Sequence, residues 1–241
     1  GFATFNQDLS AKTEFPTWAK EGKTQTVTMD YVAGLVAKAA VEAAILYQDY
    51  DWSKPWFKSV MSYANYKDNK GNGINITNAG GSLDNLNAAK MFFGLKTLAE
   101  GKFKSIAEST TASNADTQLG NALEGLEKHN KPYNLVDNKN TGGYAFPSNT
   151  TVSRDGISYD VSGGWFHKSN YINQMWLDGQ YMGPALLAQL RKNGYSPITG
   201  TIDGDWDLIA KQFTIVWEQC WDDKEKLLYH AFSSVANSTW A

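Results

Sequence analysis

Apolar residues recur at helical spacing along most of the chain. Between Met29 and Gln48 they return every three or four positions, which predicts one long helix with Thr28 as its N-cap. One face of this helix is lined by Tyr31, Leu35, Val36, Ala39, Ala43 and Leu46. Helical spacing therefore begins at Met29.

The same period predicts two helices in the C-terminal half, over 173–191 and 205–221. Pro184 lies inside the first and is expected to kink it. The stripe on the second consists of Trp206, Ile209, Phe213, Val216 and Trp217.

Three further helices are predicted over 54–66, 83–100 and 115–129, the second of them capped near Ser82 or Asp84. Successive helices joined by loops, without alternating strand patterns, indicate an all-α fold. Their spacing of roughly 40 to 50 residues favours repeated helical hairpins, although no strict sequence repeat is present.

Periodicity disappears over 130–161, where Gly, Asn, Ser, Thr and Pro dominate. The segment is far longer than usual loops inside a compact domain. It is expected to be an ordered excursion or lid within a single domain that spans 1–241.

Composition narrows the class of protein. Hydrophobic residues at 42% and charged residues at 20% are typical of a globular protein. A net charge of −3 without a block of Lys and Arg argues against a nucleic-acid partner.

The longest apolar run is interrupted by Lys38 and Glu42 and is too short to span a membrane. Because the chain opens at Gly1 without an apolar leader, an export signal is expected to be absent or already removed.

Cysteine and histidine usage excludes several chemistries. Cys220 is the single cysteine, and its helical surroundings predict a buried thiol. Only three widely spaced histidines accompany it, and neither a GxSxG elbow nor a P-loop is present. Zinc and serine chemistry are therefore not expected.

The densest chemistry lies between Gly163 and Ala188, in the segment GGWFHKSNYINQMWLDGQYMGPALLA. Polar and aromatic side chains alternate closely there, and flat amphipathic rings suit the apolar faces of sugars. The segment predicts a carbohydrate site.

This segment resembles the signature of the unsaturated rhamnogalacturonyl hydrolases and the related unsaturated glucuronyl hydrolases, glycoside hydrolase families 105 and 88. In these families a WLDG or WVD element carries the catalytic aspartate, which implies that role for Asp178. Beside Trp176 and Met175, the charged form of this carboxylate is expected to be disfavoured by desolvation, as a general acid requires.

The resemblance implies further site residues. Asp84, in GGSLDNLNAAKMFF, corresponds to the family's second aspartate, although by itself it would be read as a helix N-cap. The HK pair suits a uronate carboxylate and ring hydroxyls. The residues expected to bind substrate are Tyr31, His167, Lys168, Asn173, Gln174, Trp176 and His230.

The implied reaction begins with an oligosaccharide left by a polysaccharide lyase, whose nonreducing uronate carries a C4=C5 double bond. Asp178 would protonate C4 and then activate the water that attacks C5. No metal or organic cofactor is implied.

The implied fold is a six-hairpin α/α barrel, of which this chain supplies about the first half, so the remaining half is an expected partner. The compartment is undecided, with the periplasm or the extracellular space favoured over the cytoplasm.

Two departures keep alternatives open. Ile172 stands where the family motif usually has Pro, and no WGR or equivalent element from the family's second half occurs. A noncatalytic glycan-binding protein, or an inactive fragment of such an enzyme, is the first alternative. A calcium-bound module, suggested by DGDWD, is the second; Leu208 and Thr214 replace the Gly and Glu that an EF-hand requires, so helix capping explains these aspartates better.

Overall fold

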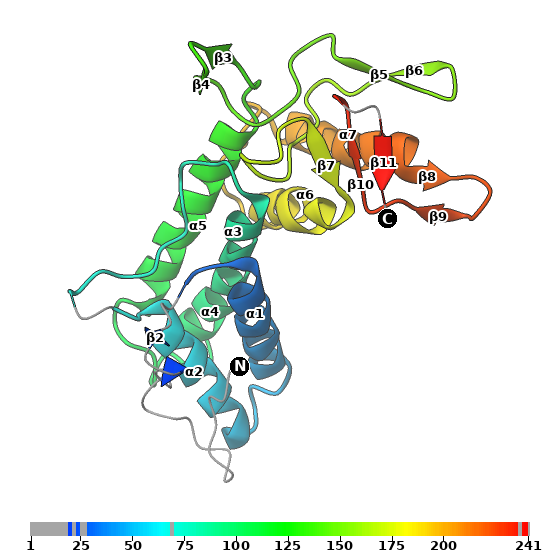
Figure 1. Cartoon of the computed structure of the whole chain (residues 1–241). Coiled ribbons are helices and arrows are strands. Elements are labelled where there is room, and N and C mark those ends of the chain that lie inside the picture. The colour runs from blue at the N-terminus through cyan, green and yellow to red at the C-terminus, as the bar shows by residue number, and fades with distance from the viewer. Residues whose placement is uncertain (1–18, 21–22, 25–27, 68–69, 236–237, 241) are drawn as a thin grey trace. The chain divides into compact units, whose positions relative to one another are not determined.

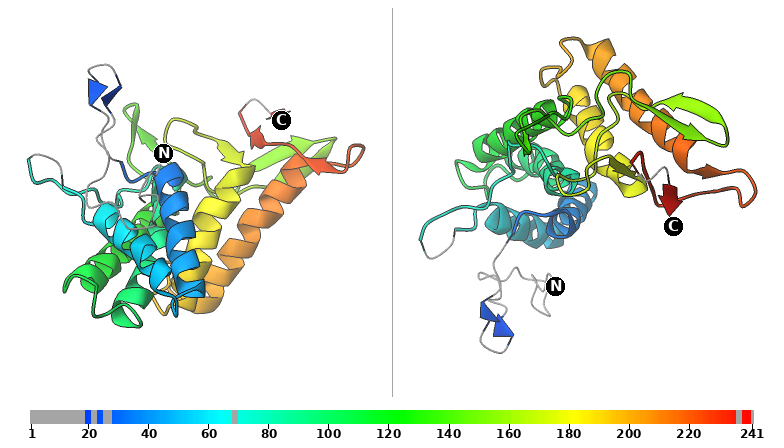
Figure 2. Two further views of the ribbon diagram at one scale, coloured as in Figure 1. Left: turned by 90° about the horizontal axis from the view of Figure 1, so that it is seen from below. Right: turned by 45° about the horizontal axis from the view of Figure 1, so that its top comes forward.

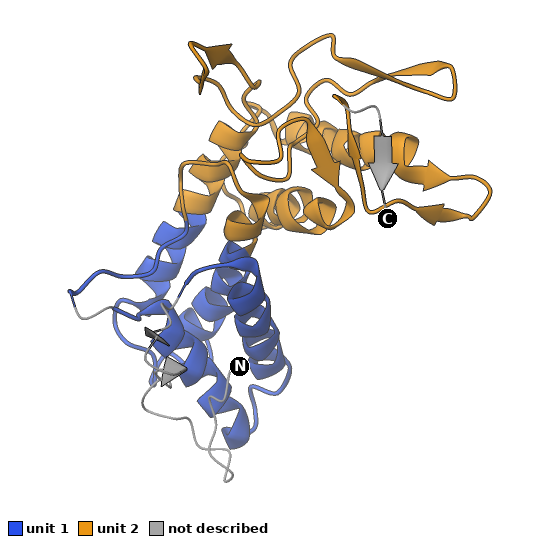
Figure 3. Cartoon of the chain, in the orientation of Figure 1, with its two compact units in different colours: residues 1–76, 88–120 blue, residues 77–87, 121–241 orange. Residues whose placement is uncertain are grey.

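The computed structural model describes residues 19–20, 23–24, 28–67, 70–235 and 238–240. It is predominantly helical, which confirms the predicted all-α class. Two compact units are present, one formed by residues 1–76 and 88–120 and the other by residues 77–87 and 121–241 (Figure 3). They are called unit 1 and unit 2 below, and each is described by itself.

Unit 1 is a small helical assembly in which α1 packs against α2, α4 and the short helix η2. Its elements are β1 (Ala19–Lys20), β2 (Lys23–Thr24), α1 (Tyr31–Leu46), η1 (Asp51–Ser53), α2 (Lys54–Ala64), η2 (Ala88–Lys90), α4 (Met91–Glu100) and residues 111–120 of α5 (Thr111–His129).

The buried face of α1 consists of its small residues and Val41. Gly34, Ala37, Val41 and Ala44 are buried, whereas the predicted stripe that includes Tyr31 is largely exposed. Close packing explains why the small residues form the buried face, since a Cβ atom at Gly34 would lie 2.5 Å from the Ala88 Cα atom.

The N-cap of α1 is Asp30 and not the predicted Thr28. The Asp30 side chain accepts a hydrogen bond from Ala33 N at 3.0 Å, while the Thr28 hydroxyl donates to Asp30 at 2.6 Å. Thr28 therefore supports the capping residue.

The predicted helix over 83–100 is interrupted. Its first turn and a half is α3 (Leu83–Asn87), which belongs to unit 2, and the chain then passes through η2 into α4 of unit 1. Ser82 caps α3, because its hydroxyl accepts a hydrogen bond from Asn85 N at 3.3 Å. The cap leaves the Asp84 carboxylate available for other contacts.

Unit 2 is built on a helical hairpin. Helices α6 (Leu177–Lys192) and α7 (Ile202–Cys220) lie side by side, and α3 packs on α6 (Figures 1 and 2). A buried ion pair of 2.9 Å between Arg191 Nε and Asp205 Oδ2 fastens the two helices near their connecting loop.

A three-stranded sheet precedes and follows this hairpin. Strand β7 (Gln174–Trp176) occupies positions predicted to be helical, and it pairs antiparallel with β10 (Ala231–Ser233), which pairs with β11 (Ser238–Trp240). In the β7–β10 register Met175 lies opposite Phe232, and both are buried. The long-range pairing explains why local helical spacing misassigned this segment.

The excursion over 130–161 contains two hairpins, β3 (Leu135–Val136) with β4 (Lys139–Asn140) and β5 (Thr151–Arg154) with β6 (Ile157–Asp160). Each turns through two residues with positive φ; in the second these are Asp155 and Gly156. An Asp-Gly pair is a strong hairpin signal. A further hairpin joins β8 (Trp221–Asp222) to β9 (Leu227–Leu228).

The core of unit 2 joins this excursion to the helical hairpin. Its apolar cluster consists of Phe146, Val152, Val161, Phe166, Met175, Ile215, Val216, Cys220 and Phe232. Cys220 is buried as predicted, and burial raises the pKa of its thiol to about 12. Among the described residues, no helix combines the length and apolarity that a membrane crossing requires.

Two glycine variants test the close packing of α1. Gly34→Ala should lower the free energy of unfolding by about 1–3 kcal/mol, because the added methyl group meets the η2 backbone. Gly120→Ala is the control, since its Cβ would meet nothing within 4 Å on α5 and alanine favours the helix. Urea unfolding of both variants measures the difference. Equal effects would contradict the packing.

Candidate active site

The backbone around His167 brings three separate parts of unit 2 together. Leu83 N donates to His167 O at 3.1 Å, and Ser169 N donates to Gly81 O at 2.8 Å. On the other side, His167 N donates to Gln174 O at 3.0 Å. The start of α3 and the strand before α6 are thereby held next to the same short segment.

Asp84 is buried beside two cationic or potentially cationic groups. Its Oδ1 atom lies 3.0 Å from His167 Nε2, and its Oδ2 atom forms an ion pair with Lys168. Burial alone would raise the pKa of Asp84, but the hydrogen bonding and charge of His167 and Lys168 outweigh it and hold the pKa below its ordinary value. Asp84 is therefore a carboxylate at neutral pH.

Asp178 lies in the first turn of α6, on the opposite side of the same imidazole. Its Oδ1 atom is 3.7 Å from His167 Nδ1, which is buried and makes no hydrogen bond among the described residues. The Asp178 side chain is 47% exposed, so the expected desolvated setting is not observed. The alternation of side chains along β7 explains why Asp178 is exposed. Met175 points into the core, whereas Trp176, which is nearer to Asp178, lies on the other face of the strand.

Aromatic rings surround His167. Trp176 stacks nearly parallel to His167 and to Tyr171, with ring centroids 5.0 and 4.9 Å apart. The His167–Tyr171 centroid distance is only 6.3 Å. The three rings therefore form one cluster of nearly parallel rings around Trp176. His230 meets Trp176 edge-on at 4.9 Å.

The two predicted amide residues have different surroundings. Gln174 uses its Oε1 atom to accept a hydrogen bond from Trp176 Nε1 at 3.1 Å. Asn173 adopts a positive φ of 64° in the turn before β7, and its carbonyl accepts from Ser234 N. Gln174 therefore orients the indole, and Asn173 shapes the turn that leads to it.

Unit 2 thus brings together eight of the nine predicted site residues: Asp84, His167, Lys168, Asn173, Gln174, Trp176, Asp178 and His230. Tyr31, the ninth, lies in unit 1 at the start of α1, and the residue is 43% exposed. A role for Tyr31 in substrate binding stays a prediction.

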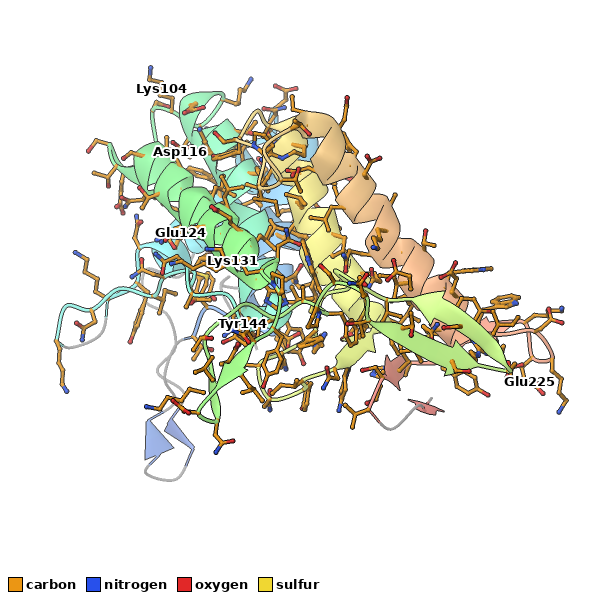
Figure 4. All side chains as sticks on the ribbon, turned by 90° about the horizontal axis from the view of Figure 1, so that it is seen from above. Lys104, Asp116, Glu124, Lys131, Tyr144 and Glu225 are labelled. Carbon is orange, nitrogen blue, oxygen red and sulfur yellow. The ribbon has the colours of Figure 1, made fainter. Side chains whose placement is uncertain are left out.

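Sequence reasoning missed His129, the last residue of α5, which is fully buried. Its Nδ1 atom accepts a hydrogen bond from Gly81 N at 3.1 Å, and its Nε2 atom lies 2.8 Å from Phe166 O. These bonds fix a neutral imidazole with its proton on Nε2. Tyr144, labelled in Figure 4, packs against the ring at a centroid distance of 5.4 Å. A lone histidine in a helix gives no sequence signal for this support.

The DGDWD segment has a structural use. Thr201 caps α7 by accepting a hydrogen bond from Gly204 N at 3.0 Å. The buried Asp205 pairs with Arg191 and accepts from Thr199 N at 2.9 Å. Within the described ranges, no group of three or more His, Cys, Asp or Glu side chains is arranged to hold a metal ion.

Comparisons with known proteins bear on the family and on the fold. Residues 155–241 match the family model described as Glycosyl Hydrolase Family 88. This part of the chain is similar to that family. The family resemblance seen in the sequence is thereby confirmed, and the matched residues include His167, Asp178 and His230, whereas Asp84 lies outside them.

A solved structure supports the fold. The structure described as a family 105 glycoside hydrolase from C. acetobutylicum ATCC 824 is similar, with a TM-score of 0.54 and 20% sequence identity. The match covers 87% of this chain and 46% of that chain. The chain therefore has the helical fold of these glycosidases and spans about half the length of this relative.

The buried His129 predicts a pH dependence of stability. Burial lowers the pKa of His129 to about 4, below the value of about 6.5 in an unfolded chain. The unfolded state then binds more protons between these values, so the contribution of His129 is complete above about pH 6.5 and is lost as the pH falls towards 4. Its size is on the order of a few kcal/mol.

The test compares unfolding free energies of the wild type and His129→Gln across this pH range. The variant should be less stable at pH 7 and should lose less stability on acidification. His230→Gln, at an exposed histidine, is the control and should follow the wild type. Parallel pH profiles for the wild type and His129→Gln would contradict the assignment.

Proposed function

We propose that this chain carries the acid/base centre of a glycoside hydrolase that removes a 4,5-unsaturated uronic acid from the nonreducing end of lyase-generated oligosaccharides. The observation that carries the proposal is the position of the His167 imidazole, 3.0 Å from Asp84 and 3.7 Å from Asp178. One carboxylate is buried and ionised, and the other is half-exposed where a substrate can reach it. The family match over 155–241 supports the same reaction class.

In the proposed reaction Asp178 donates its proton to C4 of the unsaturated uronate, and the resulting carboxylate removes a proton from the water that attacks C5. The C4=C5 double bond is consumed, one water is added, and a hemiketal forms at C5. Opening of the ring leaves a hemiacetal at C1, which expels the remaining sugar as an alcohol. The ordinary spacing rules for glycosidase carboxylates do not apply, because no group attacks C1.

The buried His167 suits a positioning role better than direct contact with substrate. Only 2% of its side chain is exposed, and Asp84 holds its Nε2 edge while its Nδ1 edge faces Asp178. Because its Nδ1 atom lies 3.7 Å from Asp178 Oδ1, His167 can influence how readily that carboxyl group gives up and takes back its proton. Asp84 therefore acts on Asp178 through the imidazole and is not required as a nucleophile.

The groups that we expect to bind the uronate lie around Asp84 and Asp178. Lys168 is 30% exposed and supplies positive charge beside Asp84. His230 is exposed and packs against Trp176 in a T-shaped arrangement, so it can reach a ligand at the same aromatic surface. We assign the uronate carboxylate to Lys168 and His230.

Replacing the acid/base group gives the first functional test. Asp178→Asn should lower kcat on unsaturated galacturonyl-rhamnose by about 10²–10⁴-fold, because the amide cannot donate and then accept the proton. Release of rhamnose measures the rate. Asp207→Asn, at an exposed aspartate of α7, is the matched control and should keep the wild-type rate. A near-normal rate for Asp178→Asn would remove Asp178 from the mechanism.

A second test separates positioning from binding. His167→Gln should lower kcat and shift its pH profile while leaving KM within about threefold, because the residue acts on Asp178 and not on the uronate. His230→Gln should instead raise KM with little change in kcat. A His167 variant that changes only KM would return His167 to the substrate-binding residues.

The glycan-binding alternative predicts a different outcome. Calorimetric titration of the same disaccharide would show binding that is retained in Asp178→Asn, while neither the wild-type chain nor its natural full-length form turns over substrate. Efficient cleavage of a saturated galacturonide would instead indicate a conventional glycosidase.

A further inference from the structure

A polar pocket lies in unit 2 beside the C-terminal end of α7, and none of its lining residues belongs to the candidate active site. Its volume is about 480 Å³, which is within the range of small-molecule sites. The pocket is bounded by β5, by the end of α7 with the start of the β8–β9 hairpin, and by the chain from Tyr229 to Ser233. Both hairpins that border it contact α7 (Figures 1 and 2).

Hydrogen bonds hold the walls of this pocket in place. Arg154 of β5 donates from Nη1 to Glu218 O at 3.1 Å and from Nη2 to Trp221 O, so the β5–β6 hairpin is bonded to carbonyl groups at the end of α7. On the other side, the Tyr229 hydroxyl donates to Asp222 Oδ2 at 2.8 Å, and the Tyr229 backbone N–H donates to the last residue of α7 at 2.8 Å. Contacts within the protein therefore form the pocket without a ligand.

Gln219 is the lining residue that the fold does not explain. It is 2% exposed, and its Nε2 atom is buried without a hydrogen-bond partner among the described residues. Gln212, about two turns earlier on α7, shows the ordinary arrangement of a buried amide. Its Oε1 atom accepts from Trp165 N at 2.8 Å, and its Nε2 atom donates to Gly163 O at 2.9 Å. A buried amide without such partners costs stability, and a polar ligand in the adjoining pocket would satisfy it.

The charge of the pocket disfavours an acidic ligand. Three of its lining residues carry carboxyl groups, Asp155, Asp222 and Asp223, whereas Arg154 is the one cation among the described lining residues. Hydrogen bonds from a backbone N–H and from the Tyr229 hydroxyl hold the pKa of Asp222 below its ordinary value, so this group is ionised at neutral pH. A uronate would therefore meet net negative charge here.

The carboxylates of the pocket are not arranged around a cation. Asp223 pairs with Lys226 at 2.7 Å. Asp155 lies 3.7 Å from Arg154, and Asp222 accepts from two backbone N–H groups. No metal-binding group of three or more acidic, His or Cys side chains occurs in the part of the chain that the structure describes. Hydroxyl groups fit better, because each can donate to a carboxylate or accept from an amide N–H.

We propose that this pocket is a second saccharide site, separate from the candidate active site, which binds a neutral sugar through Gln219. A sugar is chosen among hydroxylated molecules because most of the lining residues lie in the segment 155–241, which is similar to a glycoside hydrolase family. The inference requires neither catalysis by Asp178 nor hydration of a double bond. Failure of the proposed reaction would therefore leave it standing.

The two glutamines of α7 provide a matched test of stability. Gln219→Leu should raise the midpoint of thermal unfolding of the ligand-free protein by about 2 °C or more, because an apolar group replaces an unpartnered buried amide. Gln212→Leu is the control and should lower the midpoint, since two hydrogen bonds are lost. A fall for Gln219→Leu similar to that for Gln212→Leu would overturn the proposal, because the amide would then serve the fold.

Calorimetric titration tests binding directly, with the methyl glycosides of galactose, glucose and rhamnose and with those of galacturonate and glucuronate. At least one neutral glycoside should bind, and Gln219→Leu should weaken its binding about tenfold or more, because the hydrogen bond to the amide is lost. The same variant should leave the affinity for the uronates unchanged. Asp178→Asn should bind the neutral glycoside as tightly as the wild type does.

Three results of these titrations would overturn the proposal. One is that no neutral glycoside binds. Another is that its binding depends on Asp178 and not on Gln219, which would place the sugar in the candidate active site. The third is that calcium chloride, and no sugar, raises the unfolding midpoint of the wild type but not of Gln219→Leu, which would assign the pocket to a cation.

Discussion

The rest of the site depends on the contacts that the buried imidazole of His167 makes. It reaches Asp84 through Nε2 and faces Asp178 through Nδ1, so one ring connects a carboxylate on α3 to a carboxylate on α6. Burying Asp84 is tolerable only because Lys168 and His167 compensate its charge. The ring stays in place because its own backbone is bonded on both sides and Trp176 stacks on it.

Backbone hydrogen bonds, rather than one large core, hold the segments that carry these residues in place. His129 ties the Gly81 loop to Phe166 from the end of α5, and β7 presents Trp176 to the site while Met175 anchors the strand in the core. Asp178 follows β7 directly, in the first turn of α6. Its exposure leaves it accessible, whereas the residues that orient it are buried.

Much of the site could be predicted from the sequence, because the residues of one short segment carry the family signature. The helices were also predictable from local spacing, as α2 and α7 illustrate. Strand β7 was not, since its pairing partner lies more than fifty residues further along the chain. The buried face of α1 was missed because close packing at Gly34 outweighed the larger side chains on the opposite face. His129 was missed because its partners are backbone atoms, which a sequence does not display.

The most direct test of the central claim follows two signals in one reaction of the natural full-length protein with unsaturated galacturonyl-rhamnose. One is the ultraviolet absorbance of the conjugated double bond, and the other is free rhamnose. Hydration by Asp178 predicts that the absorbance disappears in step with rhamnose release, in a ratio of about one to one. Release of rhamnose with the absorbance retained would contradict the account, because the glycosidic bond would then be cleaved without hydration of C4=C5.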